Sequence, residues 1–155
     1  MAEAVKGVPA PPAARAIAPP FTQEHEDLRA TLRRFVEAEL YPHADEWEAA
    51  RWFPSALFPR MGELGFLGLD KPEAYGGQGG DYFSAIVLAE EMTHANCGGL
   101  AMGIAVHTDM AMPPILAFGT EEQKQEWVVP AIKGEKILCL GITEPDAGSD
   151  VAGIK

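Results

Sequence analysis

Apolar side chains recur at helical spacing along most of the chain. Between Thr22 and Pro42 they lie on one helical face, at Leu28, Leu32, Phe35, Val36 and Leu40. This spacing predicts a helix with one buried face, which begins at the capping hydroxyl of Thr22 and ends where Pro42 interrupts it. A short second helix is expected over residues 43–52, and a third from Pro54 to Gly65. Three successive helices favour a helical bundle.

Glycine and proline residues interrupt the helical spacing of apolar side chains between Leu67 and Asp81. The breaking residues are Gly68, Pro72, Gly76, Gly77, Gly79 and Gly80. A phosphate-binding loop is not supported here, because no Lys followed by Ser or Thr comes after the glycines and no clear strand precedes them. We interpret the stretch as a connector whose glycines allow positive φ or the close approach of another backbone.

Four more helices are expected after this connector. Asp81 caps the first, whose apolar stripe continues to Met92. The second, over residues 100–108, is apolar nearly all round, which is typical of a helix that is buried between neighbours or lines a pocket. A short third helix ends at Gly119. The fourth begins at Thr120, with acidic residues in its first turn and the sequence of a capping box.

The hydrophobic pattern changes after Lys136. Residues 137–142 form a short apolar run between Gly134 and a turn, which predicts a buried strand. A lone strand leaves backbone donors and acceptors unpaired along both edges, and the rest of the chain offers no second convincing strand. We therefore expect the sheet that completes this strand to lie beyond Lys155, so that the sequence is a piece of a longer protein.

Composition narrows the classes of protein. With 155 residues, 47% of them hydrophobic and 23% charged, the chain suits one ordinary domain, from which residues 1–20 stand out as a loose Ala- and Pro-rich tail. The formal net charge of −11 repels a nucleic-acid backbone, so nucleic acid is not an expected partner. No apolar run approaches the roughly 18 residues of a membrane span, and no leader sequence is recognisable. We therefore expect a cytoplasmic protein.

Several polar residues and thiols are weak candidates for chemistry. Cys97 and Cys139 have no second ligand at metal spacing and are interpreted as small buried apolar groups, so no metal site is predicted. His94 and His107 also lack a third ligand, which favours a structural or surface role. The adjacent carboxylates at positions 90 and 91 should point to different helix faces, so joint action on one substrate is not expected.

The turn after the predicted strand, residues 143–150, is the richest candidate site. Its sequence, Thr-Glu-Pro-Asp-Ala-Gly-Ser-Asp, combines hydroxyl groups with flexible backbone. Such turns present amides and hydroxyls to polar ligands, and they also occur as ordinary surface turns. Composition alone leaves both interpretations open.

This turn resembles the signature segment of the acyl-CoA dehydrogenase family, which reads Thr-Glu-Pro, a variable residue, then Ala-Gly-Ser-Asp. Residues 71–79 (KPEAYGGQG) are similar to the family's glycine-rich connector, and residues 119–124 (GTEEQK) to a later helix start. The segments agree in order and spacing from about Phe21 to Lys155, and three ordered matches are far more specific than one short motif. Asp146 replaces the glycine of many members, at the variable position.

The resemblance implies a mainly α fold. Residues 21–135 would form the N-terminal all-α domain of the acyl-CoA dehydrogenase fold. Residues 136–155 would be the first strand and the flavin loop of a middle β domain, so that the start of a β domain lies at the C-terminal end. A C-terminal helical bundle would follow outside the chain.

The resemblance also implies FAD as the cofactor and assigns residues to it. Backbone amides of Leu140, Ile142 and Thr143, with the Thr143 hydroxyl, would meet the isoalloxazine ring. Gly148 and Ser149 would meet the FAD pyrophosphate or the pantetheine arm of the substrate. The acyl pocket wall has four candidates, which are equally compatible with plain core: Met102, Ala105, Val106 and Met110.

The implied activity is α,β-dehydrogenation of an acyl-CoA thioester, with hydride transfer to FAD, in fatty acid metabolism. The family takes its catalytic base, a Glu, from its C-terminal half, so no catalytic residue is nominated among these residues. The chain alone is accordingly expected to be inactive. The resemblance further implies that the full-length protein is a homotetramer that passes electrons to an electron-transferring flavoprotein.

Two other interpretations stay open. Acyl-CoA oxidases, nitroalkane oxidases and flavin monooxygenases share the fold and parts of this loop, and they differ in whether oxygen reaches the reduced flavin. Nothing before Lys155 decides that point. The chain is also compatible with a truncated helical module that binds partners or acyl chains without redox chemistry.

Overall fold

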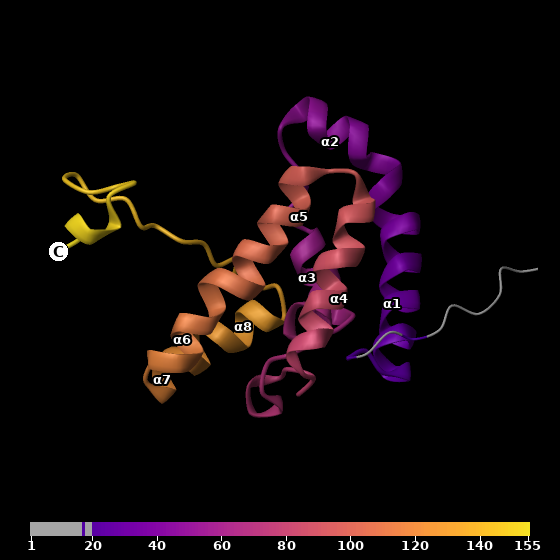
Figure 1. Ribbon diagram of the computed structural model, residues 1–155, viewed down its shortest axis with the longest axis horizontal. Helices are drawn as coiled ribbons and strands as arrows, with labels where there is room; N and C mark the ends of the chain where they lie inside the picture. Colours follow the sequence, from indigo (N-terminus) through magenta and orange to yellow (C-terminus); the bar gives the residue numbers. More distant parts are fainter. Residues whose placement is uncertain (1–16, 18–19) are drawn as a thin grey trace, which may run out of the picture.

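The computed structural model describes residue 17 and residues 20–155, and helices make up most of this part (Figure 1). The tail predicted over residues 1–20 lies outside the described residues, except for Ile17 and Pro20. The first helix, α1 (Gln23–Phe35), begins at Thr22 as predicted. There the backbone N–H of Thr22 donates to the ring nitrogen Nδ1 of His25 at 3.0 Å.

Pro42 does not interrupt the first helix in the way that was predicted. The chain continues from α1 through a π-helical turn, η1 (Val36–Leu40), and a 3₁₀ turn, η2 (Tyr41–His43), into α2 (Ala44–Ala50). Pro42 lies near the start of η2, where a residue without an N–H leaves no hydrogen bond unmade. The proline therefore redirects the chain, and α2 ends at Arg51, which has a left-handed φ of 52°.

The connector predicted from the glycines joins α3 to α4 through short turns. It follows α3 (Leu57–Glu63) and contains two 3₁₀ turns, η3 (Phe66–Gly68) and η4 (Glu73–Tyr75). Gly76, directly after η4, has a φ of 89°. This confirms that the connector uses a conformation that side chains rarely adopt.

The helix α4 (Tyr82–Met92) lies along α1 and is capped as predicted. The side chain of Asp81 accepts a hydrogen bond from the backbone N–H of Ser84 at 3.1 Å. The same carboxylate lies 2.8 Å from Nε2 of the buried His25. Asp81 thus joins the first turns of two helices, and a 3₁₀ turn, η5 (Thr93–Ala95), follows α4.

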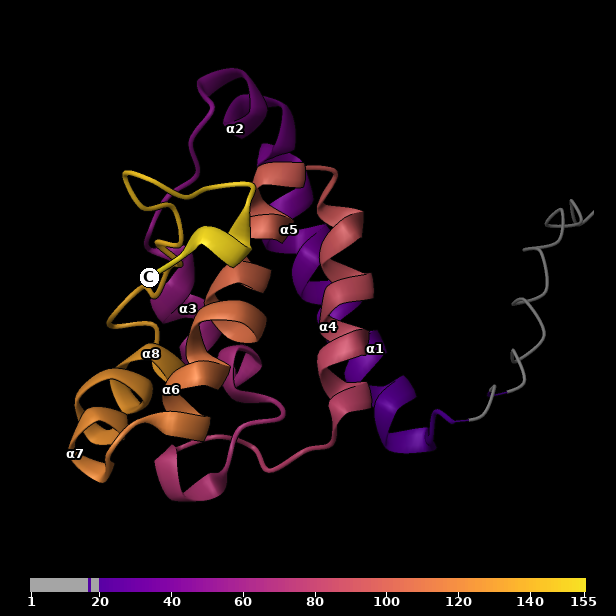
Figure 2. The ribbon, with the colours of Figure 1, turned by 60° about the vertical axis from the view of Figure 1, so that its left-hand side comes forward.

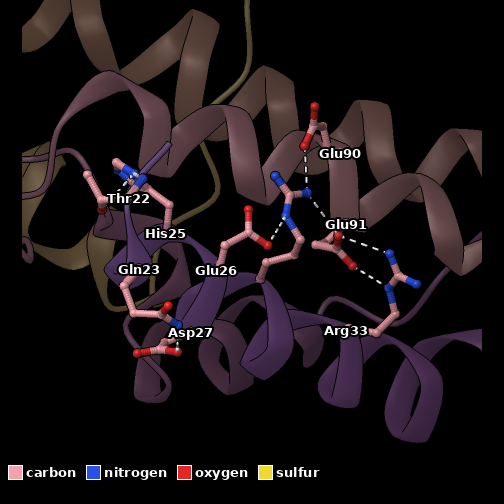
Figure 3. Close-up of polar contacts among 9 residues, drawn as sticks. Thr22, Gln23, His25, Glu26, Asp27, Arg33, Glu90 and Glu91 are labelled. Atoms are coloured by element: carbon pink, nitrogen blue, oxygen red, sulfur yellow. Dashed lines mark hydrogen bonds and ion pairs between the residues drawn. The ribbon is translucent and has the colours of Figure 1, made fainter. Parts of the chain in front are cut away.

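Ion pairs reinforce the contact between α1 and α4 (Figure 3). The side chain of Glu91 is fully buried, and its carboxylate accepts hydrogen bonds from the guanidinium groups of Arg29, at 3.2 Å, and Arg33. Arg29 also lies 2.6 Å from the half-exposed carboxylate of Glu90. Arg29 on α1 thus contacts both carboxylates of α4, the buried one of Glu91 and the half-exposed one of Glu90. Glu90 and Glu91 therefore have a structural role between the two helices.

The second half of the helical part is one long stretch where two separate helices were predicted. The helix α5 (Gly98–Ala105) continues through a π-helical turn, η6 (Val106–Ala111), into α6 (Met112–Phe118). By length and composition alone, Gly98–Phe118 is long and apolar enough to cross a membrane. Its residues Leu100, Ile104 and Met112 are buried inside the fold.

The capping box predicted at Thr120 is confirmed. The Thr120 N–H donates to the side chain of Gln123 at 2.8 Å, and the Gln123 N–H donates to the Thr120 hydroxyl at 3.3 Å. From there, α7 (Glu121–Gln123), a π-helical turn η7 (Lys124–Val128) and α8 (Val129–Ile132) run on without a break. This stretch ends at Gly134, which has a φ of 74°.

Two clusters of buried side chains hold these helices together. The larger joins α1, α3, α4 and α5 around residues such as Leu32, Met61 and Leu100. The smaller joins α6 to α8 around Met112 and Ile132, and the half-buried Leu138 packs against it. Figures 1 and 2 show α1, α4 and α5 side by side, with α6, α7 and α8 grouped together at one end.

Candidate functional site

The segment after α8 is not the buried strand that was predicted. In the described part of the chain it pairs with no other segment, and the side chains of Leu140 and Ile142 are 44% and 54% exposed. A lone strand leaves its backbone groups unpaired, and the described residues supply no other strand to pair with this segment or to cover it. Figure 1 shows this segment running away from the helices.

The peptide groups of residues 139–143 are free to bind a ligand. Within residues 20–155 their N–H groups donate to no acceptor, and the Thr143 hydroxyl has no hydrogen-bond partner. Backbone N–H groups are obligatory hydrogen-bonding groups, so in a covered site they need acceptors from elsewhere. The segment therefore presents a row of unused donors, with the apolar side chains of Leu140 and Ile142 among them.

The turn that follows is closed by its own backbone. Glu144 and Ala147 exchange hydrogen bonds, at 2.8 Å from the Glu144 N–H and at 3.3 Å from the Ala147 N–H. This closure brings Gly148 near Thr143, since a Cβ on Gly148 would lie 3.8 Å from the Thr143 methyl carbon. The carboxylate of Glu144 accepts the Lys155 N–H at 3.1 Å.

Three of the candidate cofactor contacts lie in or directly beside this turn. Thr143 and Gly148 come together across it, while Ser149 is exposed, next to the 3₁₀ turn η8 (Val151–Gly153). Leu140 and Ile142 lie on the exposed segment that leads into it. The five residues thus lie on two short stretches, 140–143 and 148–149, on either side of the closed turn, and all except the half-buried Gly148 are exposed.

The buried imidazole of His107 anchors the start of this stretch. Its Nδ1 accepts the Leu138 N–H at 3.0 Å, and its Nε2 lies 3.1 Å from the carbonyl oxygen of Ala131. The ring also packs edge-on against Phe58, with centroids 5.2 Å apart. Of the structural and surface roles expected for His107, its burial leaves the structural one, but the backbone groups that it contacts were not foreseen.

We expect the stability of the fold to depend on pH through His107. Burial lowers the pKa of His107, so the folded state keeps the ring neutral where the unfolded state binds a proton. The free energy of unfolding should therefore decrease as pH falls below about 6.5, the pKa of an unfolded histidine. Urea denaturation between about pH 7 and pH 5 measures this slope.

A matched pair of variants isolates the slope. His107→Phe removes the titrating group and should flatten the slope relative to the unmodified protein. His94→Asn removes a histidine at an exposed position and is the control for the loss of a histidine as such. Equal slopes in the unmodified protein and the Phe variant would contradict the assignment.

Two hollows border α5, and the candidate acyl-wall residues divide between them. The first, about 250 Å³, lies between α4 and α5 and includes Met102 and Ala105 in its wall, with Thr108 and Asp109 as its polar members. The second, about 610 Å³, includes Val106. Met110 lines neither hollow, so the structure does not bring all four candidates together.

Aromatic side chains and the segment after α8 form much of the second hollow. Trp47, Trp52 and Phe53 line it together with Gly103 of α5 and residues 137–139. The hollow therefore adjoins the exposed segment that carries the unused peptide donors. An apolar ligand lying in it would meet both the helices and that segment.

The two cysteines differ in their surroundings. Both line the second hollow, but Cys97 is buried and Cys139 is exposed, so the prediction that both are buried is wrong for Cys139. The cause is again that no other described segment pairs with or covers the segment that carries it. Burial raises the pKa of the Cys97 thiol.

Within residue 17 and residues 20–155, no group of three or more His, Cys, Asp or Glu side chains is placed to hold a metal ion.

Comparison with known proteins gives a consistent result over most of the chain. A family model described as the acyl-CoA dehydrogenase N-terminal domain matches residues 22–135. The mitochondrial long-chain specific acyl-CoA dehydrogenase of Sus scrofa is 38% identical over 135 residues, which cover 87% of this chain and 31% of that protein.

Solved structures resemble the fold closely. An acyl-CoA dehydrogenase from Geobacillus kaustophilus has a TM-score of 0.82 and 40% identity, over 89% of this chain and 36% of that one. An acyl-CoA dehydrogenase from Bacillus anthracis, complexed with FAD, has a TM-score of 0.79 and 37% identity, over 88% of this chain and 23% of that one. The chain thus spans about a third or less of the length of these relatives.

Proposed function

Because the chain belongs to the acyl-CoA dehydrogenase family, we propose that it supplies the N-terminal helical part of an enzyme that oxidises an acyl-CoA thioester between its α and β carbons. The single observation that carries this proposal is the row of unused peptide donors at residues 139–143, beside the second hollow. The family's cofactor is FAD, which when bound supplies the hydride acceptor.

The residues present fit an FAD isoalloxazine ring. A flat ring with polar atoms along one edge requires hydrogen-bond donors at that edge and apolar groups against its face. We propose that the amides of Leu140, Ile142 and Thr143, with the Thr143 hydroxyl, bind the pyrimidine edge of the ring. Donors aimed there favour the negative charge that develops on reduction. Gly148 and Ser149 would hold the FAD pyrophosphate or the pantetheine arm of the substrate.

The acyl chain is assigned to the surroundings of α5. Met102, with Ala105, lines the hollow between α4 and α5, which is one place for the chain. Val106 lines the second hollow, which also includes residues 137–139 and is therefore the place nearer the proposed flavin contacts. Both hollows are lined mainly by apolar side chains, as the burial of a hydrocarbon requires.

The remaining chemistry is proposed to come from outside these residues. Removal of the α-proton requires a carboxylate within hydrogen-bond reach of the substrate. We assign that base to none of the 155 residues, so the chain alone would be inactive. A tetrameric enzyme of fatty acid metabolism in the cytoplasm, which passes its electrons to an electron-transferring flavoprotein, completes the proposal.

The full-length protein gives a direct test of FAD binding. We expect it to purify with, or to take up, FAD, and its flavin absorbance to bleach when an acyl-CoA is added without oxygen. Thr143→Val should weaken FAD binding by up to about tenfold, because one hydrogen bond is lost. The control is Thr31→Val, at an exposed threonine on α1 that bonds its own helix, and it should have no effect.

The alternatives predict different results. Rapid reoxidation of the reduced flavin by air would favour an oxidase or monooxygenase of the same superfamily. A full-length protein that retains no FAD, even with excess cofactor, would contradict the proposal and leave the non-catalytic helical module as the better interpretation.

A further inference from the structure

One hydrogen bond joins the exposed C-terminal segment to the helices. Among the described residues, the bond from the Leu138 N–H to His107 Nδ1, at 3.0 Å, is the one hydrogen bond or ion pair between residues 137–155 and residues 20–136. The side chain of Leu138 adds an apolar contact with the smaller core cluster. The Leu138–His107 pair therefore supplies the polar contact that holds the segment against the helices in the described structure.

The surroundings of His107 fix its ring firmly. The side chain has no exposed surface, and the ring is held between the Ala131 carbonyl and the edge of Phe58. Because the Leu138 N–H is a donor, Nδ1 must carry the lone pair, and the ring proton must lie on Nε2, where it donates to Ala131. Both nitrogens are thus committed, and rotation of the ring would break both bonds.

This anchor lies close to the proposed flavin contacts along the chain. A residue extends the backbone by at most about 3.6 Å, so the Leu140 peptide lies within about 7 Å of Leu138 and the Thr143 peptide within about 18 Å. Cofactor contacts need to be held within about 0.5 Å of their productive geometry. An anchor at this distance therefore restricts where the first flavin contact lies.

We propose that His107 is a positioning residue for the flavin, which acts by holding the Leu138 peptide and so placing the amides of residues 140–143. The inference rests on the proposed function, because it assumes that these amides meet FAD. His107 touches neither the cofactor nor the substrate in this assignment. Its effect passes through the backbone of the segment.

Two substitutions separate positioning from plain structural support. In His107→Asn, the side-chain oxygen lies near the place of Nδ1 and still accepts the Leu138 N–H, but the bond to Ala131 is lost. In His107→Gln, the longer side chain brings its NH₂ near the place of Nε2 and keeps the bond to Ala131, but the acceptor for Leu138 is lost. Each variant loses one buried hydrogen bond, so the two should be destabilised to a similar extent.

The experiment compares these variants in the full-length protein. We expect the FAD dissociation constant to rise about tenfold in the Gln variant, the equivalent of one lost hydrogen bond, and to stay within about twofold in the Asn variant. In flavin-free protein, hydrogen exchange at the Leu138 amide should accelerate in the Gln variant alone. Leu138→Pro, which removes the donor itself, should weaken FAD binding as the Gln variant does, and it serves if the Gln variant fails to fold.

The outcomes distinguish the positioning role of His107 from the proposed function. Equal FAD affinity in the Asn and Gln variants, or unchanged affinity in Leu138→Pro, would overturn the positioning role. If the unmodified protein bound no FAD, the proposed function would fail. The exchange rate of Leu138 would then still show whether His107 anchors the segment.

Discussion

Replacing Glu91 with alanine is expected to lower the free energy of unfolding by about 2–4 kcal/mol, one of the two largest effects that we predict. The carboxylate has no exposed surface, and it accepts hydrogen bonds from Arg29 and Arg33. Its removal leaves cavity space and two guanidinium groups without their shared partner. The estimate lies toward the low end for buried pairs because both arginines are partly exposed.

The neighbouring carboxylate supplies a matched control. Glu90 also contacts Arg29, but its side chain is 49% exposed. Glu90→Ala should therefore cost less than about 1 kcal/mol. Urea denaturation of both variants measures the difference, and equal costs would show that the buried position of Glu91 contributes nothing special.

Acid should weaken this contact. Burial by itself would raise the pKa of Glu91, but hydrogen bonds from Arg33 and Arg29 outweigh it, and the pKa lies below its ordinary value. The stabilisation is thus present above about pH 4.3, the pKa of an unfolded glutamate, and it is lost as pH falls through the lower folded value. This loss at low pH should be absent from Glu91→Ala.

Gly134→Ala is expected to destabilise the fold by about 2–5 kcal/mol. Gly134 has a φ of 74°, where a side chain costs about 1–2 kcal/mol. A Cβ there would also lie 2.1 Å from the Phe58 carbonyl oxygen, so the backbones of α3 and the end of α8 would have to separate. Such overpacking adds about 1–3 kcal/mol.

Gly76 separates these two contributions. It has a similar φ of 89°, but a Cβ at Gly76 would meet nothing within 4 Å. Gly76→Ala should therefore cost only the backbone term of about 1–2 kcal/mol. Thermal or urea unfolding of both variants gives the comparison, and the idea of a close approach fails if Gly134→Ala is no more damaging than Gly76→Ala.

The sequence predicted most of the helical part, because helix starts are local. Thr22, Asp81 and Thr120 each begin a helix as expected, through bonds to residues three positions along. Two predicted helix ends were wrong, and both lie at π-helical turns. The turn η1 continues the first helix toward Pro42, and η6 joins two predicted helices into one. Such turns depend on packing between distant elements, and the spacing of apolar residues along the chain does not reveal that packing.

The candidate site was predictable only in part. Its residues were located through the resemblance of residues 143–150 and their neighbours. The exposure of Cys139 and Ile142 was not predicted, because the spacing of apolar residues does not show whether another segment covers them. His107 showed no signal beyond being a lone histidine. Its partners are backbone groups 24 and 31 residues away, and backbone groups leave no pattern in a sequence.

The helix α5 serves as a common wall, because it borders both the hollow lined by Met102 and the hollow lined by Val106. Its glycine-rich face meets the second hollow, where a Cβ on Gly103 would lie 2.9 Å from the ring of Phe53. A sideways shift of α5 would change the room in both compartments, because the helix contributes side chains or backbone to the walls of both.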